Sequence, residues 1–154
     1  MFRQEAPMPI LLVDDDADCR LLLRDAISEC VPSRIFEVAD GQSALDFVFQ
    51  RGAYRDAPRP ALIYLDIEMP GLSGHEVLAQ IKRSPAHRDI PVVMMTGLAD
   101  EEHIRRAARN GANSYTLKPT DAQQLMRTVA ASTNYWTRIH QHPRHCCEAE
   151  LCAS

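Results

Sequence analysis

The sequence lacks the features of an exported or membrane-spanning protein. Residues 1–9 do not show the charged, apolar and small-residue pattern of a signal peptide. No apolar run approaches the roughly 20 residues that a transmembrane helix needs. The five cysteines are an odd number, which in the absence of secretory features indicates free thiols rather than a disulfide framework. These absences predict a cytoplasmic protein that has no membrane partner.

Excess charge, repeats and metal-binding spacing are also missing. A net charge of −4 over 154 residues is mild, and it gives no reason to expect nucleic acid as a partner. The chain shows no internal repeat and no low-complexity segment. Residues 140–154 include histidine and cysteine but lack the paired spacing of a structural zinc site, so we expect a poorly ordered tail. These 15 residues are also too few for a DNA-binding output domain.

What the sequence does contain is an alternation of short apolar runs and helical patterns. Apolar residues make up 45% of the chain, enough for one ordinary domain with its own core. The apolar runs predict strands, and the segments between them have helical spacing. Wholly apolar strands joined by helices predict an α/β protein with a parallel sheet covered on both faces. The predicted strands are residues 10–13, 35–38, 61–65, 91–95 and 114–117, and the predicted helices begin near residues 17, 41, 74, 100 and 121.

Reactive side chains follow four of these strands. They are Asp14 and Asp15, then Asp66, Thr96 and Lys118. In an open parallel sheet, ligands bind beyond the carboxyl ends of the strands. Three carboxylates can crowd together there when a divalent cation offsets their repulsion, and oxygen ligands with room for water favour Mg²⁺. We expect the third aspartate of the first group, Asp16, to cap the following helix instead.

Asp66 is the candidate nucleophile of this site. A carboxylate oxygen can attack phosphorus and form an acyl phosphate. The cation and Lys118 would stabilise the charge on the transferring phosphoryl oxygens, and the Thr96 hydroxyl would donate a hydrogen bond to one of them. The sequence therefore predicts phosphoryl transfer to an aspartate.

These motifs resemble the receiver domain of two-component response regulators. They are Asp14-Asp15, Asp66 with Met69-Pro70-Gly71, Thr96, and Tyr115 with Lys118-Pro119. The resemblance implies a flavodoxin-like, doubly wound fold of five strands in the order 2-1-3-4-5, formed by residues 9–139 between tails 1–8 and 140–154. It also implies that Asp66 accepts a phosphoryl group from a sensor histidine kinase. Such a protein signals through altered protein contacts with a downstream partner, and catalyses only its own phosphorylation and dephosphorylation.

The same resemblance assigns roles to further residues. Mg²⁺ would be held by Asp14 (through a water molecule), Asp15, Asp66 and the main-chain carbonyl of Glu68. Thr96 and Tyr115 would form a switch pair, and the Lys118–Pro119 bond would be cis. The loop 52–60, the run 90–93 and Tyr135-Trp136 resemble the stand-alone regulators associated with phytochrome-type kinases. That implies a homodimer made through the fourth and fifth helix faces and the C-terminal extension, with Trp136 as a candidate interface residue.

Two other functions fit part of the pattern. An aspartate-nucleophile phosphatase of the haloacid dehalogenase type would use Asp14 and Asp16, but it leaves the motifs at residues 69–71 and 118–119 without a role. A docking module could keep the fold and accept no phosphate, although the intact set of charged residues argues against it. Taken singly, Tyr115 and Trp136 are also compatible with ordinary core packing.

Overall fold

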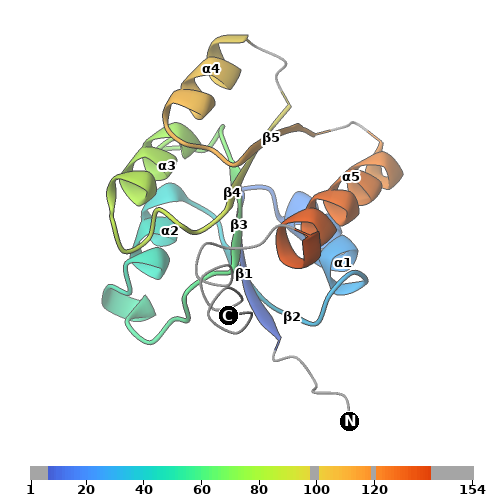
Figure 1. Ribbon diagram of the computed structural model, residues 1–154, viewed down its shortest axis with the longest axis horizontal. Helices are drawn as coiled ribbons and strands as arrows, with labels where there is room; N and C mark the ends of the chain where they lie inside the picture. Colours follow the sequence, from blue (N-terminus) through green and yellow to red (C-terminus); the bar gives the residue numbers. More distant parts are fainter. Residues whose placement is uncertain (1–6, 98–100, 119–120, 140–154) are drawn as a thin grey trace, which may run out of the picture.

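The computed structural model describes residues 7–97, 101–118 and 121–139. Strands and helices alternate along the chain, as the sequence predicts (Figure 1). The elements are β1 (Met8–Val13), α1 (Ala17–Ser28), β2 (Ser33–Val38), α2 (Gly41–Val48), a 3-10 turn η1 (Gly52–Tyr54), β3 (Leu62–Asp66), α3 (Gly74–Arg83), β4 (Val92–Thr96), α4 (Glu101–Arg109), β5 (Ser114–Leu117), α5 (Ala122–Asn134) and a π-helical turn η2 (Tyr135–Ile139).

The five strands form one parallel sheet in the order β2-β1-β3-β4-β5. This order confirms the flavodoxin-like prediction. Strands β1 and β3 are neighbours near the centre, so the chain switches direction across the sheet between them. The loops after β1 and β3 therefore lie next to each other, at the place where ligands bind in this class of sheet.

Both faces of the sheet are covered by helices. Helices α1 and α5 lie on one face, and α2, α3 and α4 lie on the other (Figure 1). Strands β3 and β4 are buried along their whole length, which is why they read as continuous apolar runs. Alternate residues face opposite layers: Leu11, Val13, Ile63 and Leu65 pack toward α2 and α3, whereas Ile10, Leu12, Leu62 and Tyr64 pack toward α1 and α5.

Helix ends differ most from the sequence-based expectation. The apolar pattern that begins at Ala17, with Pro32 as its stop, predicts a first helix that reaches about Val31. In the structure α1 ends at Ser28, because Cys30 and Val31 both donate to the Ile27 carbonyl in a closing turn. The apolar stripe of the last helix, which runs from Ala122 to Ile139, predicts one regular helix over this span, but the structure changes to a π-helical turn at Tyr135. There the Thr137 hydroxyl donates to the Thr133 carbonyl at 2.6 Å and so competes for an acceptor of the regular ladder.

Two further expectations, the lack of a membrane-spanning helix and the lack of a disulfide framework, concern the described residues. In this part of the chain, no helix is both long enough and apolar enough to cross a membrane. Cys19 is a free thiol, as expected, and the Cys30 thiol donates to the Ala26 carbonyl at 3.2 Å, while the cysteines of the tail lie outside the described residues.

Candidate functional site

Three carboxylates converge at the carboxyl end of the sheet. Asp14 and Asp15 follow β1 directly, and Asp66 is the last residue of β3. Val13 pairs with Leu65 across these neighbouring strands, so the residues after them lie side by side. One carboxylate oxygen from each of the three aspartates lies within 4.8 Å of the others. These three residues, called the acidic cluster below, come together as the strand ends predict.

Lys118 reaches the acidic cluster from the end of β5. Its Nζ lies 2.6 Å from Asp14 Oδ2 and 3.3 Å from Asp66 Oδ1. The Lys118 main-chain N–H donates to the Thr96 carbonyl at 2.7 Å, which holds the lysine beside the end of β4. Asp14 and Asp66 are only 2% and 6% exposed, so their charges are poorly hydrated and depend on this ammonium group.

Burial and neighbouring charge alter the protonation of this site. Burial is the main reason why the pKa of Asp66 rises to about 6; Lys118 opposes the rise and the Asp14 carboxylate adds to it. Burial alone would lower the pKa of Lys118, but its hydrogen bond to Asp14 and the charges of Asp14 and Asp66 raise it above the ordinary value. At neutral pH the lysine is therefore charged and Asp66 is mostly ionised.

Helix α1 begins immediately after the acidic cluster. The Asp16 carboxylate accepts hydrogen bonds from the main-chain N–H groups of Asp18 and Cys19, which makes it the N-cap, as expected. The Asp16 N–H in turn donates to Asp14 Oδ1 at 2.9 Å. The buried Cys19 thiol lies beside Asp14, and burial together with that carboxylate raises its pKa to about 12, so it stays protonated.

The other expected residues occupy the surrounding strand ends and loops. Thr96 is fully buried as the last residue of β4, and Tyr115 is half-buried in β5, where it packs against the core on the α2–α3–α4 side. Glu68 lies in the loop after β3, with its side chain exposed. The expected cis bond before Pro119, the helix start near Asp100 and the 140–154 tail fall outside the described residues. The switch and ligand roles of these residues remain predictions.

The sequence left two roles open for Trp136, core packing and an interface contact. The ring is partly buried and packs against the core on the α1–α5 side. It also contacts Tyr135 edge-on, with ring centroids 4.9 Å apart. Tyr135 is the more exposed of the two, at 46%. Trp136 thus contributes to the core, and its place in an interface remains a prediction.

Gly74 is a part of the site that sequence reasoning missed. A Cβ at this position would overlap the Asp66 carbonyl oxygen and would lie 2.8 Å from Ile67 Cα. The Gly74 N–H donates to the Ile67 carbonyl at 3.0 Å. Only glycine therefore allows the start of α3 to pack against the main chain that carries Asp66. A single glycine at a helix start is too common to signal this role on its own.

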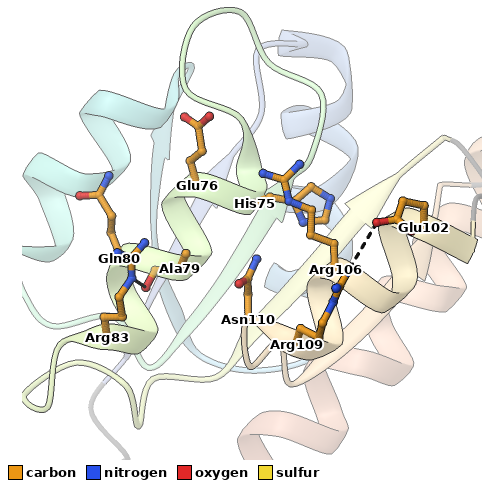
Figure 2. A pocket seen from close by; sticks show the side chains of 9 residues that line it. All are labelled: His75, Glu76, Ala79, Gln80, Arg83, Glu102, Arg106, Arg109 and Asn110. Atoms are coloured by element: carbon orange, nitrogen blue, oxygen red, sulfur yellow. Dashed lines mark hydrogen bonds and ion pairs between the residues drawn. The ribbon is translucent and has the colours of Figure 1, made fainter.

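A histidine pair, also missed, joins α3 to α4. His75 Nε2 lies 3.0 Å from His103 Nδ1, and the two rings are nearly parallel. His75 is 1% exposed, and its burial, with nearby Arg106 and His103, lowers its pKa to about 4. Its ring is therefore uncharged at neutral pH. His75 lines a polar cavity of about 740 Å³ between α3 and α4, and no member of the acidic cluster lines it (Figure 2).

The acidic cluster has the chemistry of a divalent-cation site. Among the residues that the structure describes, it is the only group of three or more carboxylate, imidazole or thiol ligands close enough to share an ion. All its donors are oxygens, which suits a hard cation such as Mg²⁺. One buried ammonium balances only part of the charge of three carboxylates. The donor set therefore fits Mg²⁺, with Asp15, the exposed member, on the solvent side.

Comparison with known proteins gives consistent results. The family profile described as the response regulator receiver domain matches residues 10–130. The chain is 40% identical over 141 residues to the probable methanogenesis regulatory protein FilR2 of Methanothrix harundinacea, covering 90% of each chain. It is 34% identical over 131 residues to response regulator Rcp1 of Synechocystis, covering 84% of this chain and 89% of Rcp1.

Solved structures show the same likeness. The phosphorylated cyanobacterial phytochrome response regulator RcpA superposes with a TM-score of 0.86 at 33% identity, covering 90% of this chain and 99% of RcpA. The Mn²⁺-bound form of response regulator Rcp1 superposes with a TM-score of 0.84 at 31% identity, covering 89% of this chain and 99% of Rcp1. The alternative of a haloacid dehalogenase-type phosphatase finds no support in these matches.

Proposed function

Since this chain belongs to the family of response regulator receiver domains, which signal through phosphorylation, we propose that Asp66 is its phosphoacceptor. The family implies a histidine kinase as the donor. The observation that carries the proposal is the place of Asp66: it ends a central strand, is buried, and has both the acidic cluster and Lys118 within reach. Asp14 is also buried and also contacts Lys118, but its two carboxylate oxygens already accept hydrogen bonds from the Asp16 N–H and from Lys118.

Mg²⁺ is the proposed cofactor of the acidic cluster. Asp15 and Asp66 would hold it through side-chain oxygens, with the main-chain carbonyl of Glu68, and Asp14 would bind it through water. When bound, the ion neutralises negative charge on the phosphoryl group. The oxygen donors of the cluster and its excess of negative charge support this assignment.

The transfer itself would use three side chains of this chain. A carboxylate oxygen of Asp66 forms a bond to phosphorus while the bond from phosphorus to the donor histidine nitrogen breaks, and that nitrogen keeps the electron pair. The Lys118 ammonium, already 3.3 Å from Asp66 Oδ1, stabilises the developing charge on the phosphoryl oxygens. The Thr96 hydroxyl donates to one of the same oxygens. Apart from this transfer and the hydrolysis of the resulting acyl phosphate, which releases inorganic phosphate, we assign the protein no catalytic activity.

The output would follow from the added charge. A phosphoryl group brings about −1.5 to −2 charges to a buried site, which draws Thr96 and Lys118 toward it and lets Tyr115 turn inward. Three elements that follow Thr96 in the chain carry exposed apolar side chains, namely Ile104 on α4, Leu117 on β5 and Tyr135 after α5. A change at Thr96 and Tyr115 would therefore alter a surface suited to protein contacts.

The proposed partners are a phytochrome-type kinase, a downstream protein and a second copy of this chain, all in the cytoplasm. The likeness to Rcp1 and RcpA supports the kinase type.

Sedimentation analysis of the full chain, with and without the phosphoryl mimic beryllofluoride and Mg²⁺, tests the dimer, which we expect in the mimic-bound form. Phosphotransfer from a panel of purified histidine kinases tests the kinase class. A monomer under both conditions, or no preference for phytochrome-type kinases, would remove the corresponding partner.

Magnesium binding and its pH dependence test the site directly. Calorimetric titration should show one bound Mg²⁺ at pH 7.5. Because Asp66 has a pKa of about 6 in the metal-free protein and must lose its proton to bind, apparent affinity should fall below that pH, approaching about tenfold per pH unit. Above pH 7 the affinity should be nearly constant. Absence of Mg²⁺ binding, or an affinity that does not change between pH 7 and pH 5, would contradict the assignment.

A further inference from the structure

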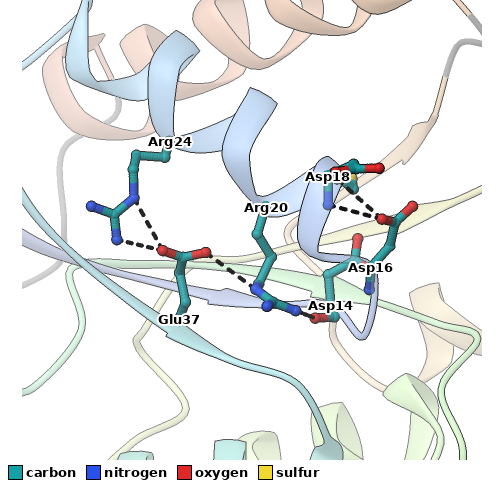
Figure 3. A network of polar contacts seen from close by, with 7 residues as sticks. Asp14, Asp16, Asp18, Arg20, Arg24 and Glu37 are labelled. Atoms are coloured by element: carbon teal, nitrogen blue, oxygen red, sulfur yellow. Dashed lines mark hydrogen bonds and ion pairs between the residues drawn. The ribbon is translucent and has the colours of Figure 1, made fainter.

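Arg20, which is not a member of the acidic cluster, contacts the main chain of Asp14, the first residue of that cluster. Arg20 Nη1 donates to the Asp14 carbonyl oxygen at 2.6 Å. Figure 3 shows the guanidinium group extending from α1 to this oxygen. The arginine side chain is 18% exposed, so water competes only weakly for this hydrogen bond. The contact ties α1 to the point where β1 passes into the acidic loop.

Glu37 of β2 holds the same guanidinium group from the other side. Arg20 Nε lies 3.1 Å from Glu37 Oε1, and the second carboxylate oxygen binds Arg24 (Figure 3). Glu37 itself is fixed by the sheet, because it pairs in register with Leu12 of β1. The arginine therefore has one donor on a fixed carboxylate and another on the Asp14 main chain, a geometry that its planar fork permits.

Asp14 is thus held at each of its polar groups. Its N–H donates to the Val38 carbonyl at 3.2 Å, and its carbonyl oxygen accepts from Arg20. Its carboxylate accepts from the Asp16 N–H at 2.9 Å and from Lys118 at 2.6 Å. Of these contacts, only that of Arg20 restrains the peptide unit that connects Asp14 to Asp15. The direction of the Asp15 side chain depends on that peptide unit.

We propose that Arg20, oriented by Glu37, is a positioning residue that fixes the Asp14–Asp15 peptide so that both carboxylates face Asp66. The inference rests on the proposed Mg²⁺ site. The two possible effects of Arg20 on Mg²⁺ affinity, through its charge and through its orientation of the ligands, have opposite signs. As a cation near a cation site, Arg20 would weaken Mg²⁺ binding by repulsion, so its removal by charge alone would tighten binding. A residue that orients ligands strengthens binding, and its removal weakens it.

The test compares two arginines that bind the same glutamate. Arg20→Ala should weaken Mg²⁺ binding about tenfold, the lower end of the effect for groups that orient metal ligands. Arg24→Ala removes the same charge from Glu37, but the Arg24 guanidinium group binds Glu37 and not the Asp14 main chain, so this substitution should leave the affinity within about twofold. Arg20→Lys keeps the charge but not the fork, and should fall between Arg20→Ala and the wild type. Unchanged or tighter binding by Arg20→Ala would overturn the proposal.

A second readout needs no metal. In the metal-free protein, amide hydrogen exchange at Asp16 should be faster in Arg20→Ala than in wild type and unchanged in Arg24→Ala, because the Asp16 N–H depends on the position of Asp14. If Arg20→Ala does not fold, Glu37→Gln takes its place in the test. This variant keeps Arg20 but weakens its ion pair with residue 37, and it should show the same faster exchange at Asp16. Equal exchange in all variants would also overturn the proposal. Failure of the wild type to bind Mg²⁺ would instead overturn the proposed function.

Discussion

Replacing Lys118 with methionine is expected to destabilise the metal-free protein by about 3–5 kcal/mol, and Mg²⁺ is expected to restore much of that loss. Lys118 is the cation that contacts both Asp14 and Asp66, which are almost fully buried. Its removal leaves their charges close together without this partner. The Asp66 pKa should then rise further, so the stability of the variant should fall as pH increases through that pKa, because the ionised form is the costly one. Urea unfolding with and without Mg²⁺ measures both effects.

Lys82 provides a matched control for this experiment. It is also a partly buried lysine, with a pKa lowered to about 8 chiefly by burial, but its Nζ donates to neutral oxygens of Arg88, Ile90 and Asn113. Lys82→Met should lose stability by removing these hydrogen bonds, and Mg²⁺ should stabilise it only as much as it stabilises the wild type, so the difference from wild type should remain. A Lys118→Met protein as stable as wild type, or one that Mg²⁺ rescues no better than it rescues Lys82→Met, would show that the acidic cluster is not held together by charge compensation.

The second large effect is expected from Asp66→Asn. Incubated with a small phosphodonor and Mg²⁺, this variant should incorporate phosphate only at background level, because an amide oxygen is a far weaker nucleophile than a carboxylate. The substitution keeps the size of the side chain, so the fold should be retained. Its Mg²⁺ affinity should also decrease, since one of three carboxylates is lost. Phosphate incorporation and circular dichroism together separate loss of the acceptor from loss of the fold.

An exposed aspartate serves as the control for the acceptor. Asp56 lies in the loop before β3 with its side chain 96% exposed, and Asp56→Asn should be labelled like wild type. Asp14→Asn should be labelled more slowly, because it retains the acceptor but disturbs the cation site and the Lys118 contact. Labelling of Asp66→Asn at the wild-type level, or complete loss in Asp14→Asn alone, would place the acceptor elsewhere.

Much of this site could be predicted from sequence, since each reactive residue directly follows an apolar run. Asp66 ends a strand buried on both faces, and Asp14 and Asp15 follow another, so parallel topology alone brings their carboxylates to one edge of the sheet. The particular strand order came from the family resemblance, because strand runs of similar length and composition do not encode their neighbours. The cap at Asp16 followed from local chemistry within one helical turn.

The contacts that sequence reasoning missed join residues far apart in the chain. Arg20 and Glu37 are 17 positions apart, and His75 and His103 are 28 apart; each residue taken singly resembles an ordinary surface or core side chain. The role of Gly74 depends on how closely α3 approaches the Asp66 main chain, a distance set by tertiary packing. The π-helical turn at Tyr135 likewise depends on a side-chain hydrogen bond that helical periodicity does not reveal.

The most direct measurement is to locate the phosphoryl group chemically. The full chain is phosphorylated with a small phosphodonor and Mg²⁺, the acyl phosphate is reduced with borohydride, and the peptides are mapped by mass spectrometry. Reduction converts a phosphorylated aspartate to homoserine. We expect homoserine at position 66, and none when Mg²⁺ is omitted. Homoserine at position 14, the nucleophile expected of a phosphatase, or no modified aspartate at all, would contradict the account.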